Sequence, residues 1–372
     1  MGNCATTLKP GLQCPEEAIF LPNLGYDSGY VWGGELNEAA ENPYALCIFE
    51  APDNKPLFQH AQMRYEGIPQ TSLYVRTILT VGNYDYLQTF SVRPDGDFEL
   101  NKELSGYVVG SYHIPDAVKM DLFGSYISKS SIGALHTHSA TYKVDLDVGV
   151  GGNGFKVKTF NYGDIANAVP PGFDMTGVKT ASPNSYYYTT EYVTNEGMWD
   201  NDGDDTWTPP DACLRVNANK KFIIYNTEEE GYLGVKRGIM IDIPVSPTQM
   251  LPEGDPYLHI QNFTKCDIGV TKLNPNDLEA VSMDVFGNLK PRPAPAGQDI
   301  SHFFDGESIE SEDLVVYIHS TKPHYVITED VPVPATMGKP VVFEPYNYFK
   351  DGVAPFKYLP GDIKVAEPCI AS

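Results

Sequence analysis

The sequence predicts an all-β fold, a large antiparallel β-sandwich with few short helices. Glycine and proline account for 33 and 30 of the 372 residues, and such frequent breaks leave little room for helices. Between the breaks lie short runs rich in β-branched and aromatic residues, which are typical of strands. A hydrophobic fraction of 42%, with 24 Tyr and 17 Phe, supplies a large core and excludes global disorder. No linker clearly divides the chain, so we expect one unit.

The expected strands follow one another with turn signals between them. They include residues 73–81, 155–160, 221–225, 238–243 and 314–318. Residues 93–97, Arg-Pro-Asp-Gly-Asp, predict a hairpin turn, because Asp-Gly tolerates positive φ.

Two short motifs match ligand-binding patterns but lack the required context. Residues 149–154 match G-x-G-x-x-G, yet a strand-like run follows instead of the helix that would hold pyrophosphate. We therefore predict a glycine-rich hairpin turn there. The acidic cluster at residues 200–205 lacks the residue order and flanking helices of an EF-hand. We interpret the surrounding stretch, residues 195–210, as a surface loop.

The charge balance excludes two classes of partner. Twenty-six Lys and Arg against 49 Asp and Glu give a net charge of −23. Nucleic acids and anionic membrane surfaces both require clustered basic residues. No apolar run is long enough to span a bilayer. We therefore expect neither a nucleic-acid nor a membrane partner.

Six scattered cysteines contain no C-x-x-C pair, which argues against a zinc ribbon or a thioredoxin motif. One or two disulfides are compatible with their number and would indicate an oxidising compartment. Residues 262–264, Asn-Phe-Thr, match a glycosylation acceptor. These features suggest a secreted protein.

A histidine pair is the first feature with clear chemical content. Residues i and i+2 of a strand point to one face, so His136 and His138 can present two imidazoles side by side. If the strand continues, Asp145 and Asp147 form a pair of hard oxygen ligands on the opposite face, suited to calcium. The pair is compatible with a metal site or with two polar surface histidines. Spacing alone does not choose a third ligand among His60, His113, His259, His302, His319 and His324.

Four segments, in order along the chain, resemble the motifs of copper amine oxidases. Residues 80–86 (TVGNYDY) resemble the N-Y-[DE]-Y motif, and residues 135–148 (LHTHSATYKVDLDV) resemble the H-x-H and D-L-D segments. Residues 312–332 resemble the segment that carries the third copper histidine, and residues 345–349 (PYNYF) the trailing motif. The resemblance covers roughly residues 1–350. It implies that the whole chain, residues 1–372, is a catalytic domain without the smaller N-terminal domains.

The resemblance implies a role for each matching residue. Tyr84 is the expected precursor of the topaquinone cofactor, and Asn83 is expected to orient the quinone ring. The expected copper(II) ligands are His136, His138 and His324. Calcium is expected at Asp145, Leu146 (carbonyl), Asp147, Asp313 and Leu314 (carbonyl), and a second calcium at Glu196, Phe303 (carbonyl), Asp305 and Glu307. Cys14 and Cys47 match a family disulfide.

The activity implied by the family is the oxidation of a primary amine by O2, which yields an aldehyde, ammonia and hydrogen peroxide. The quinone acts as the electron sink that side chains alone do not supply. The family also implies a homodimer. The sequence does not identify the amine.

One departure concerns the catalytic base. Residues 1–3 align with the end of a glycine-rich run that follows the family's catalytic aspartate, so that aspartate is expected upstream of Met1. Asp27 lies beyond the Cys14 motif, and we interpret it as a turn residue. A general base contributes about 10²–10⁴-fold to a rate. We therefore expect this chain to bind copper, and to oxidise amines slowly.

Two other interpretations belong to different classes. An inactive β-sandwich that keeps metals for structure and acts in binding or adhesion would not need Tyr84. A cupin-like dioxygenase would need a carboxylate beside its histidines, whereas strand parity places Asp145 and Asp147 on the opposite face. The amine oxidase hypothesis is favoured over both.

Overall fold

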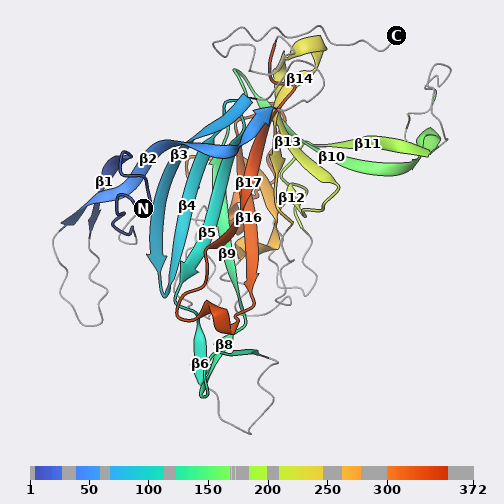
Figure 1. Cartoon of the computed structure of the whole chain (residues 1–372). Helices are drawn as coiled ribbons and strands as arrows, with labels where there is room; N and C mark the ends of the chain where they lie inside the picture. Colours follow the sequence, from blue (N-terminus) through green and yellow to red (C-terminus); the bar gives the residue numbers. More distant parts are fainter. Residues whose placement is uncertain are drawn as a thin grey trace. The chain divides into compact units, whose positions relative to one another are not determined.

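The computed structural model describes residues 5–26, 39–58, 68–112, 123–167, 169, 172, 184–198, 209–245, 262–277 and 300–350. Within these ranges the chain is almost entirely strand and turn (Figure 1). The described helices have at most four residues, as in α2 (Ile300–Phe303) and the 3-10 turn η5 (Asn262–Lys265). The predicted all-β class, with large antiparallel sheets, is confirmed. None of these short helices could cross a membrane.

The chain divides into two compact units. Unit 1 comprises residues 1–136, 323–344 and 353–372, and unit 2 comprises residues 137–322 and 345–352. Each unit is described separately below.

The sheet of unit 1 contains six strands in the order β1-β2-β3-β4-β5-β17, all with antiparallel neighbours. Their bounds are β1 Ile19–Tyr26, β2 Ala39–Phe58, β3 Ile68–Val81, β4 Tyr84–Val92, β5 Phe98–Gly106 and β17 Met337–Tyr346. The first five are consecutive in the sequence, so this sheet is largely a meander of neighbouring strands.

Two tight turns set the register of the central strands. The predicted turn at residues 93–97 joins β4 to β5, closed by hydrogen bonds from Arg93 N to Asp97 O (2.8 Å) and from Gly96 N to Arg93 O (3.1 Å). Gly82 and Asn83 join β3 to β4, and Val81 pairs directly with Tyr84. Gly82 has φ 65°, which suits the first position of a two-residue hairpin. This turn places Tyr84 at the very start of β4.

Unit 1 also contains a three-stranded sheet in the order β6-β8-β7. Its strands are β6 Gly110–Tyr112, β7 Gly124–Tyr126 and β8 Ser131–Ala134. A separate apolar cluster gathers Leu8, Ile78 and the disulfide between Cys14 and Cys47. The predicted pairing of these two cysteines is confirmed.

Unit 2 contains two sets of strands. One runs β14-β13-β10-β11, formed by β10 Asn153–Asp164, β11 Asn184–Val193, β13 Lys220–Glu230 and β14 Lys236–Asp242. The other runs β12-β15-β16-β9, formed by β9 His136–Asp145, β12 Cys213–Leu214, β15 Ile268–Lys272 and β16 Leu314–His324. A second disulfide, between Cys213 and Cys266, ties β12 to the segment that leads into β15. Six consecutive buried residues open β16, as expected of a strand covered on both faces.

Two sequence predictions need correction. The glycine-rich run at residues 149–154 is not a hairpin turn, because β9 and β10 belong to different sheets. The run connects the two sheets instead. Residues 195–198, which begin the predicted surface loop, do not form a surface loop either. Glu196 is only 1% exposed, and its neighbours Asn195 and Met198 form β-bridges with Ser308 and Asp305. Residues 199–208, with the acidic cluster, lie outside the described part of the chain, as does Asp27.

Candidate metal and cofactor centre

Tyr84 is held in a buried position by its strand neighbours. Its side chain is 4% exposed. On the neighbouring strand β5 it faces Gly106, and a Cβ at position 106 would lie 2.7 Å from the Tyr84 Cα and 2.6 Å from the Asn83 carbonyl oxygen. Only glycine permits so close an approach, and its φ of 110° is in the region that favours glycine. Gly106 therefore fixes the backbone at Tyr84, a role that the sequence analysis did not assign.

The Tyr84 hydroxyl takes part in two hydrogen bonds. It accepts one from the Val109 backbone N–H (3.3 Å) and lies 3.1 Å from Nδ1 of His324. Burial is the main cause that raises the pKa of this phenol, so the hydroxyl is protonated at neutral pH. A protonated hydroxyl donates to Nδ1 of His324, which is then the nitrogen without a proton.

The other side of the His324 ring supports this assignment. Its Nε2 lies 3.3 Å from Oδ2 of Asp330, and the same oxygen accepts a hydrogen bond from the Ile327 N–H (2.9 Å). A carboxylate accepts, so Nε2 carries the proton. Carboxylates commonly orient metal-binding histidines in this way. The 2% exposed His324 ring is therefore fixed with Nδ1 toward Tyr84. The sequence analysis included Asp330 in a family motif but gave it no role.

His136 is oriented by a backbone carbonyl. Its Nδ1 lies 2.8 Å from the Ala134 oxygen, which makes Nδ1 the donor and leaves Nε2 as the nitrogen able to bind a metal. Its ring centroid lies 5.0 Å from that of His324 and 5.5 Å from that of Tyr84. Two residues along β9, His138 is only 5% exposed. His138 is thus withdrawn from solvent and His136 is half-buried, unlike ordinary surface residues.

His136, His138 and His324 together form one of the described side-chain groups that could hold a metal ion. Each offers a ring nitrogen, and these nitrogens lie within 4.8 Å of one another. Three imidazole donors suit Cu(II), which favours nitrogen ligands. The residues present therefore fit the metal that the sequence motifs imply.

Asn83 occupies a position beside Tyr84, at the turn between β3 and β4. Its side-chain amide donates to the Tyr107 carbonyl (2.5 Å), and the Tyr107 N–H donates back to the Asn83 carbonyl (2.7 Å). Asn83 thus fastens this turn to the segment that follows β5. The two hydrogen bonds between Asn83 and Tyr107 therefore constrain the backbone next to Tyr84.

The three predicted calcium aspartates also come together, in unit 2. Carboxylate oxygens of Asp145, Asp147 and Asp313 lie within 4.8 Å of one another. Strand β9 ends at Asp145, so Asp147 lies in the following loop and not on the opposite strand face. Desolvation and the charges of Asp145 and Asp147 raise the pKa of Asp313. Such crowding of like charges is relieved by a cation, and hard oxygen ligands suit calcium.

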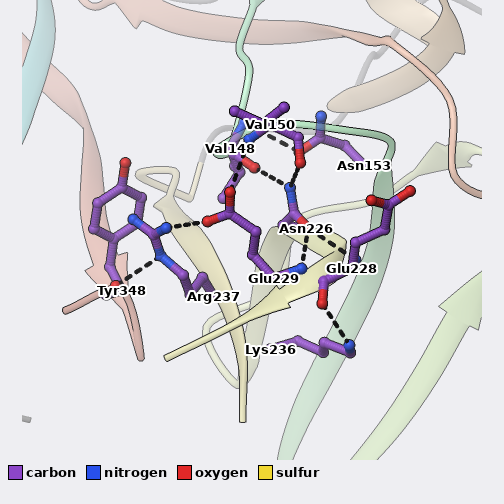
Figure 2. Close-up of polar contacts among 9 residues, drawn as sticks. All are labelled: Val148, Val150, Asn153, Asn226, Glu228, Glu229, Lys236, Arg237 and Tyr348. Carbon is purple, nitrogen blue, oxygen red and sulfur yellow. Dashed lines mark hydrogen bonds and ion pairs between the residues drawn. The ribbon is translucent and has the colours of Figure 1, made fainter. Parts of the chain in front are cut away.

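Figure 2 shows the polar network that holds the loop after Asp147. Asn226, fully buried on β13, donates to the carbonyl oxygens of Val148 (2.6 Å) and Val150 (2.9 Å). The side-chain amide oxygen of Asn226 accepts hydrogen bonds from the backbone N–H groups of Glu228 and Glu229. One buried amide therefore connects the loop after Asp147 to the end of β13.

The rest of the network supports Asn226 from both sides. Asn153 accepts a hydrogen bond from the Val148 N–H (3.1 Å), and its backbone exchanges two hydrogen bonds with Glu312, the residue before Asp313. On the other side Arg237 pairs with Glu229 and donates to the Tyr348 carbonyl (2.8 Å). These contacts bring the Asp147 loop and Asp313 to one place. No local sequence pattern marks Asn226 or Asn153 for this role.

A third acidic group contains the residues predicted for the second calcium. Carboxylate oxygens of Glu196, Asp305 and Glu307 lie within 4.8 Å of one another. Glu196 accepts hydrogen bonds from the backbone N–H groups of Lys272 (2.8 Å) and Asp305 (3.1 Å). Burial, opposed by those two bonds, raises the pKa of Glu196 to about 7. Phe303, predicted to contribute its carbonyl, is the last residue of the short helix just before Asp305.

Three comparisons with known proteins place this geometry in context. The profile described as "copper amine oxidase, enzyme domain" matches residues 1–355. The human copper-containing diamine oxidase is 27% identical over 361 residues, which cover 94% of this chain and 44% of the human protein. The copper amine oxidase vicK1 of Bipolaris victoriae is 28% identical over 357 residues, covering 95% of this chain and 46% of that protein. The chain thus spans about half the length of the curated relatives it matches.

Solved structures agree at the level of the fold. The Aspergillus nidulans amine oxidase superposes with a TM-score of 0.75 at 22% identity, covering 96% of this chain and 44% of that chain. The copper-containing benzylamine oxidase of Hansenula polymorpha gives 0.76 at 15% identity, covering 96% and 51%. Since the profile match extends over nearly the whole chain, this protein belongs to the copper amine oxidase family.

Proposed function

We propose that this chain forms the catalytic domain of a primary amine oxidase that uses copper and topaquinone. Tyr84 is the proposed quinone precursor, and His136, His138 and His324 are the proposed copper ligands. The observation that carries the proposal is the buried hydroxyl of Tyr84 lying 3.1 Å from Nδ1 of His324, inside a group of three imidazoles. A structural metal site would have no need of a tyrosine in this position.

Copper and the quinone, when bound, would supply the redox chemistry that converts a primary amine, O2 and water into an aldehyde, ammonia and hydrogen peroxide. The chain itself supplies orientation and exclusion of water. Asp330 fixes the His324 tautomer, Ala134 fixes that of His136, and the Val109 N–H holds the Tyr84 oxygen. Nδ1 of His324, the nitrogen left without a proton, would hold the metal ion, and it lies 3.1 Å from the Tyr84 oxygen.

We further propose that two calcium ions stabilise unit 2. Asp145, Asp147 and Asp313, with the carbonyls of Leu146 and Leu314, would hold one ion. Glu196, Asp305 and Glu307, with the carbonyl of Phe303, would hold the other. The mutual approach of each set of carboxylates supports this assignment. A homodimer is proposed on family resemblance alone.

The test is a covalent label for the cofactor. The protein is purified in air with copper, treated with phenylhydrazine and digested. A coloured adduct is expected on the peptide that contains residue 84, and Tyr84→Phe should give none. Labelling is preferable to amine turnover, because it reads Tyr84 without requiring a catalytic base.

Two controls sharpen the result. His324→Ala should reduce both bound copper and adduct, whereas His319→Ala, a buried histidine outside the metal group, should leave bound copper unchanged. Stoichiometric copper without any adduct would refute the proposal and favour a metal-stabilised sandwich without catalytic function.

A further inference from the structure

A second polar site lies on unit 1, at the far end of β4 from Tyr84. It is a pocket of about 400 Å³ between β2, β3, β4 and β5, lined in part by Asp53, Tyr74 and Arg93. Ser91, which also lines it, is an odd number of residues from Tyr84, so the pocket opens on the opposite face of the strand. Its size falls within the usual range for small-molecule sites, roughly 300–1,000 Å³. Nothing in the proposed oxidation chemistry uses it.

Asp53 is the centre of this pocket. Its carboxylate accepts hydrogen bonds from the side chains of Gln70, Ser72 (2.6 Å) and Tyr74. Gln70 and Ser72 are 5% and 2% exposed, so these two donors are fixed by the strand that carries them. Tyr74 is fixed by stacking on Phe49, with ring centroids 5.2 Å apart. Three neutral donors therefore hold the carboxylate in one orientation.

The arrangement keeps Asp53 ionised. Partial desolvation acts to raise the pKa of this carboxyl, but the hydrogen bonds from Ser72, Tyr74 and Gln70 and the charge of Lys55 together hold it below its usual value. Three hydrogen bonds do not fill the roughly four lone-pair positions of a carboxylate. Within the part of the chain that the structure describes, one acceptor position remains for a further donor.

The basic residues of the pocket do not neutralise Asp53. Arg93 is paired with Asp97 (3.2 Å) and with Glu99, so its charge is already balanced. Lys55 lines the pocket, but its side chain is exposed to solvent. Within the described ranges no base lies at ion-pair distance from Asp53. Among the described residues, Asp53 is therefore a carboxylate of the pocket without an ion-pair partner, and its orientation is fixed.

We propose that this pocket binds an organic ammonium ion, whose N–H group donates to Asp53 while its apolar part lies against the Tyr74 ring. A cation near the face of an aromatic ring is also attracted by that ring, in addition to its bond with the carboxylate. The site would hold an amine without reacting with it. The inference does not rest on oxidation at Tyr84, since the pocket and the proposed cofactor lie at opposite ends of β4.

The test uses tert-butylammonium, a primary amine without an α-hydrogen, which cannot be oxidised to an aldehyde. Its binding to the full chain at pH 7 is measured by calorimetry or by saturation-transfer NMR. Asp53→Asn should weaken binding at least tenfold. Tyr84→Phe and Glu17→Gln, an exposed acid outside the pocket, should bind as the native chain does. Circular dichroism checks that each variant is folded.

Several outcomes would overturn the proposal. Equal binding by Asp53→Asn and the native chain is one, and loss of binding in Tyr84→Phe alone is another, because the amine would then occupy the cofactor centre. If Asp53→Asn does not fold, Tyr74→Phe replaces it, with a weakening of about threefold or more expected. Binding of inorganic phosphate that depends on Lys55, with no binding of the ammonium, would show that the pocket takes anions instead.

Discussion

Gly106 has no side chain, and for that reason it allows the backbone approach that positions Tyr84 in the candidate cofactor centre. The hydroxyl of Tyr84 reaches His324 only if the start of β4 lies tightly against β5. That approach brings the Tyr84 backbone within 2.7 Å of where a Cβ on residue 106 would be. Gly82 provides a natural comparison, because it also has positive φ but has nothing within 4 Å of its own Cβ position.

Gly106→Ala is expected to displace Tyr84 and to reduce phenylhydrazine labelling at residue 84 by tenfold or more. Gly82→Ala should lose only the free energy needed to hold alanine in a left-handed backbone conformation, about 1–2 kcal/mol. The folded fraction of this variant should keep most of its phenylhydrazine labelling at residue 84. Labelling is compared at equal bound copper. Similar losses in both variants would mean that backbone strain, and not displacement of Tyr84, is responsible.

At the scale of the element, the loop after Asp147 is ordered by a residue from another strand. The buried Asn226 side chain satisfies two carbonyls of that loop and two N–H groups of its own strand (Figure 2). Buried polar groups that lose their partners destabilise a protein by about 1–3 kcal/mol each. The loop geometry, and with it the group of carboxylates proposed to bind calcium, depends on this amide.

Asn226→Ala should weaken calcium binding by about tenfold without removing any proposed ligand. Isothermal titration with Ca²⁺ measures the effect on the purified chain. Asn219→Ala, a substitution of an asparagine on the turn before β13, is the matched control and should leave the affinity unchanged. If Asn226→Ala binds Ca²⁺ as tightly as the native chain does, the carboxylates are positioned without the hydrogen bonds of Asn226.

These elements also show what sequence alone can and cannot predict. His136 and His138 were predictable as a pair, because strand periodicity places i and i+2 on one face. Residues 93–97 were predictable as a turn, because Asp-Gly has a local conformational preference. His324 could be chosen from eight histidines only by family resemblance, since no local rule relates it to Tyr84.

The errors have a common physical cause. The glycine-rich run at residues 149–154 was expected to close a hairpin, but the chain crosses between sheets there, and local preferences do not encode which strands pair. Asn226 escaped notice for the same reason, because its hydrogen bonds reach a segment that is distant in the sequence. Asp330 is only six residues from His324, and its role depends on the turn that brings the two side chains together.

At the scale of the whole molecule, the net charge of −23 implies that carboxylates crowd one another in the folded state. Asp97 illustrates this outside the metal groups. Burial, together with the charges of Asp95 and Glu344, raises the pKa of its carboxyl from 3.8 to about 6, despite the opposing effect of Arg93. The folded protein then binds a proton more tightly at this residue than the unfolded chain does. Its contribution to stability is present at pH 4 and is lost as the pH rises to 6.

Asp97→Asn removes that ionisation, so its effect should depend on pH. At pH 4 the variant and the native chain should unfold at similar denaturant concentrations. At pH 7 the variant should be more stable, by about 1–2 kcal/mol after allowing for the lost attraction to Arg93. Urea unfolding at both values measures the difference, with Glu17→Gln as a surface control. If the variant and the native chain differ in unfolding free energy by the same amount at both pH values, the raised pKa of Asp97 is contradicted.

The hydrogen bond between Tyr84 and His324 joins residues 240 positions apart, and this separation has a consequence for biosynthesis. At a translation rate of about 5–20 residues per second, Tyr84 leaves the ribosome roughly 10–50 s before His324 does. During that interval strands β3 and β4 can pair, but the third imidazole does not yet exist. The proposed conversion of Tyr84 would therefore be a post-translational event that waits for the C-terminal part of the chain, and a prematurely terminated product would keep an unmodified Tyr84.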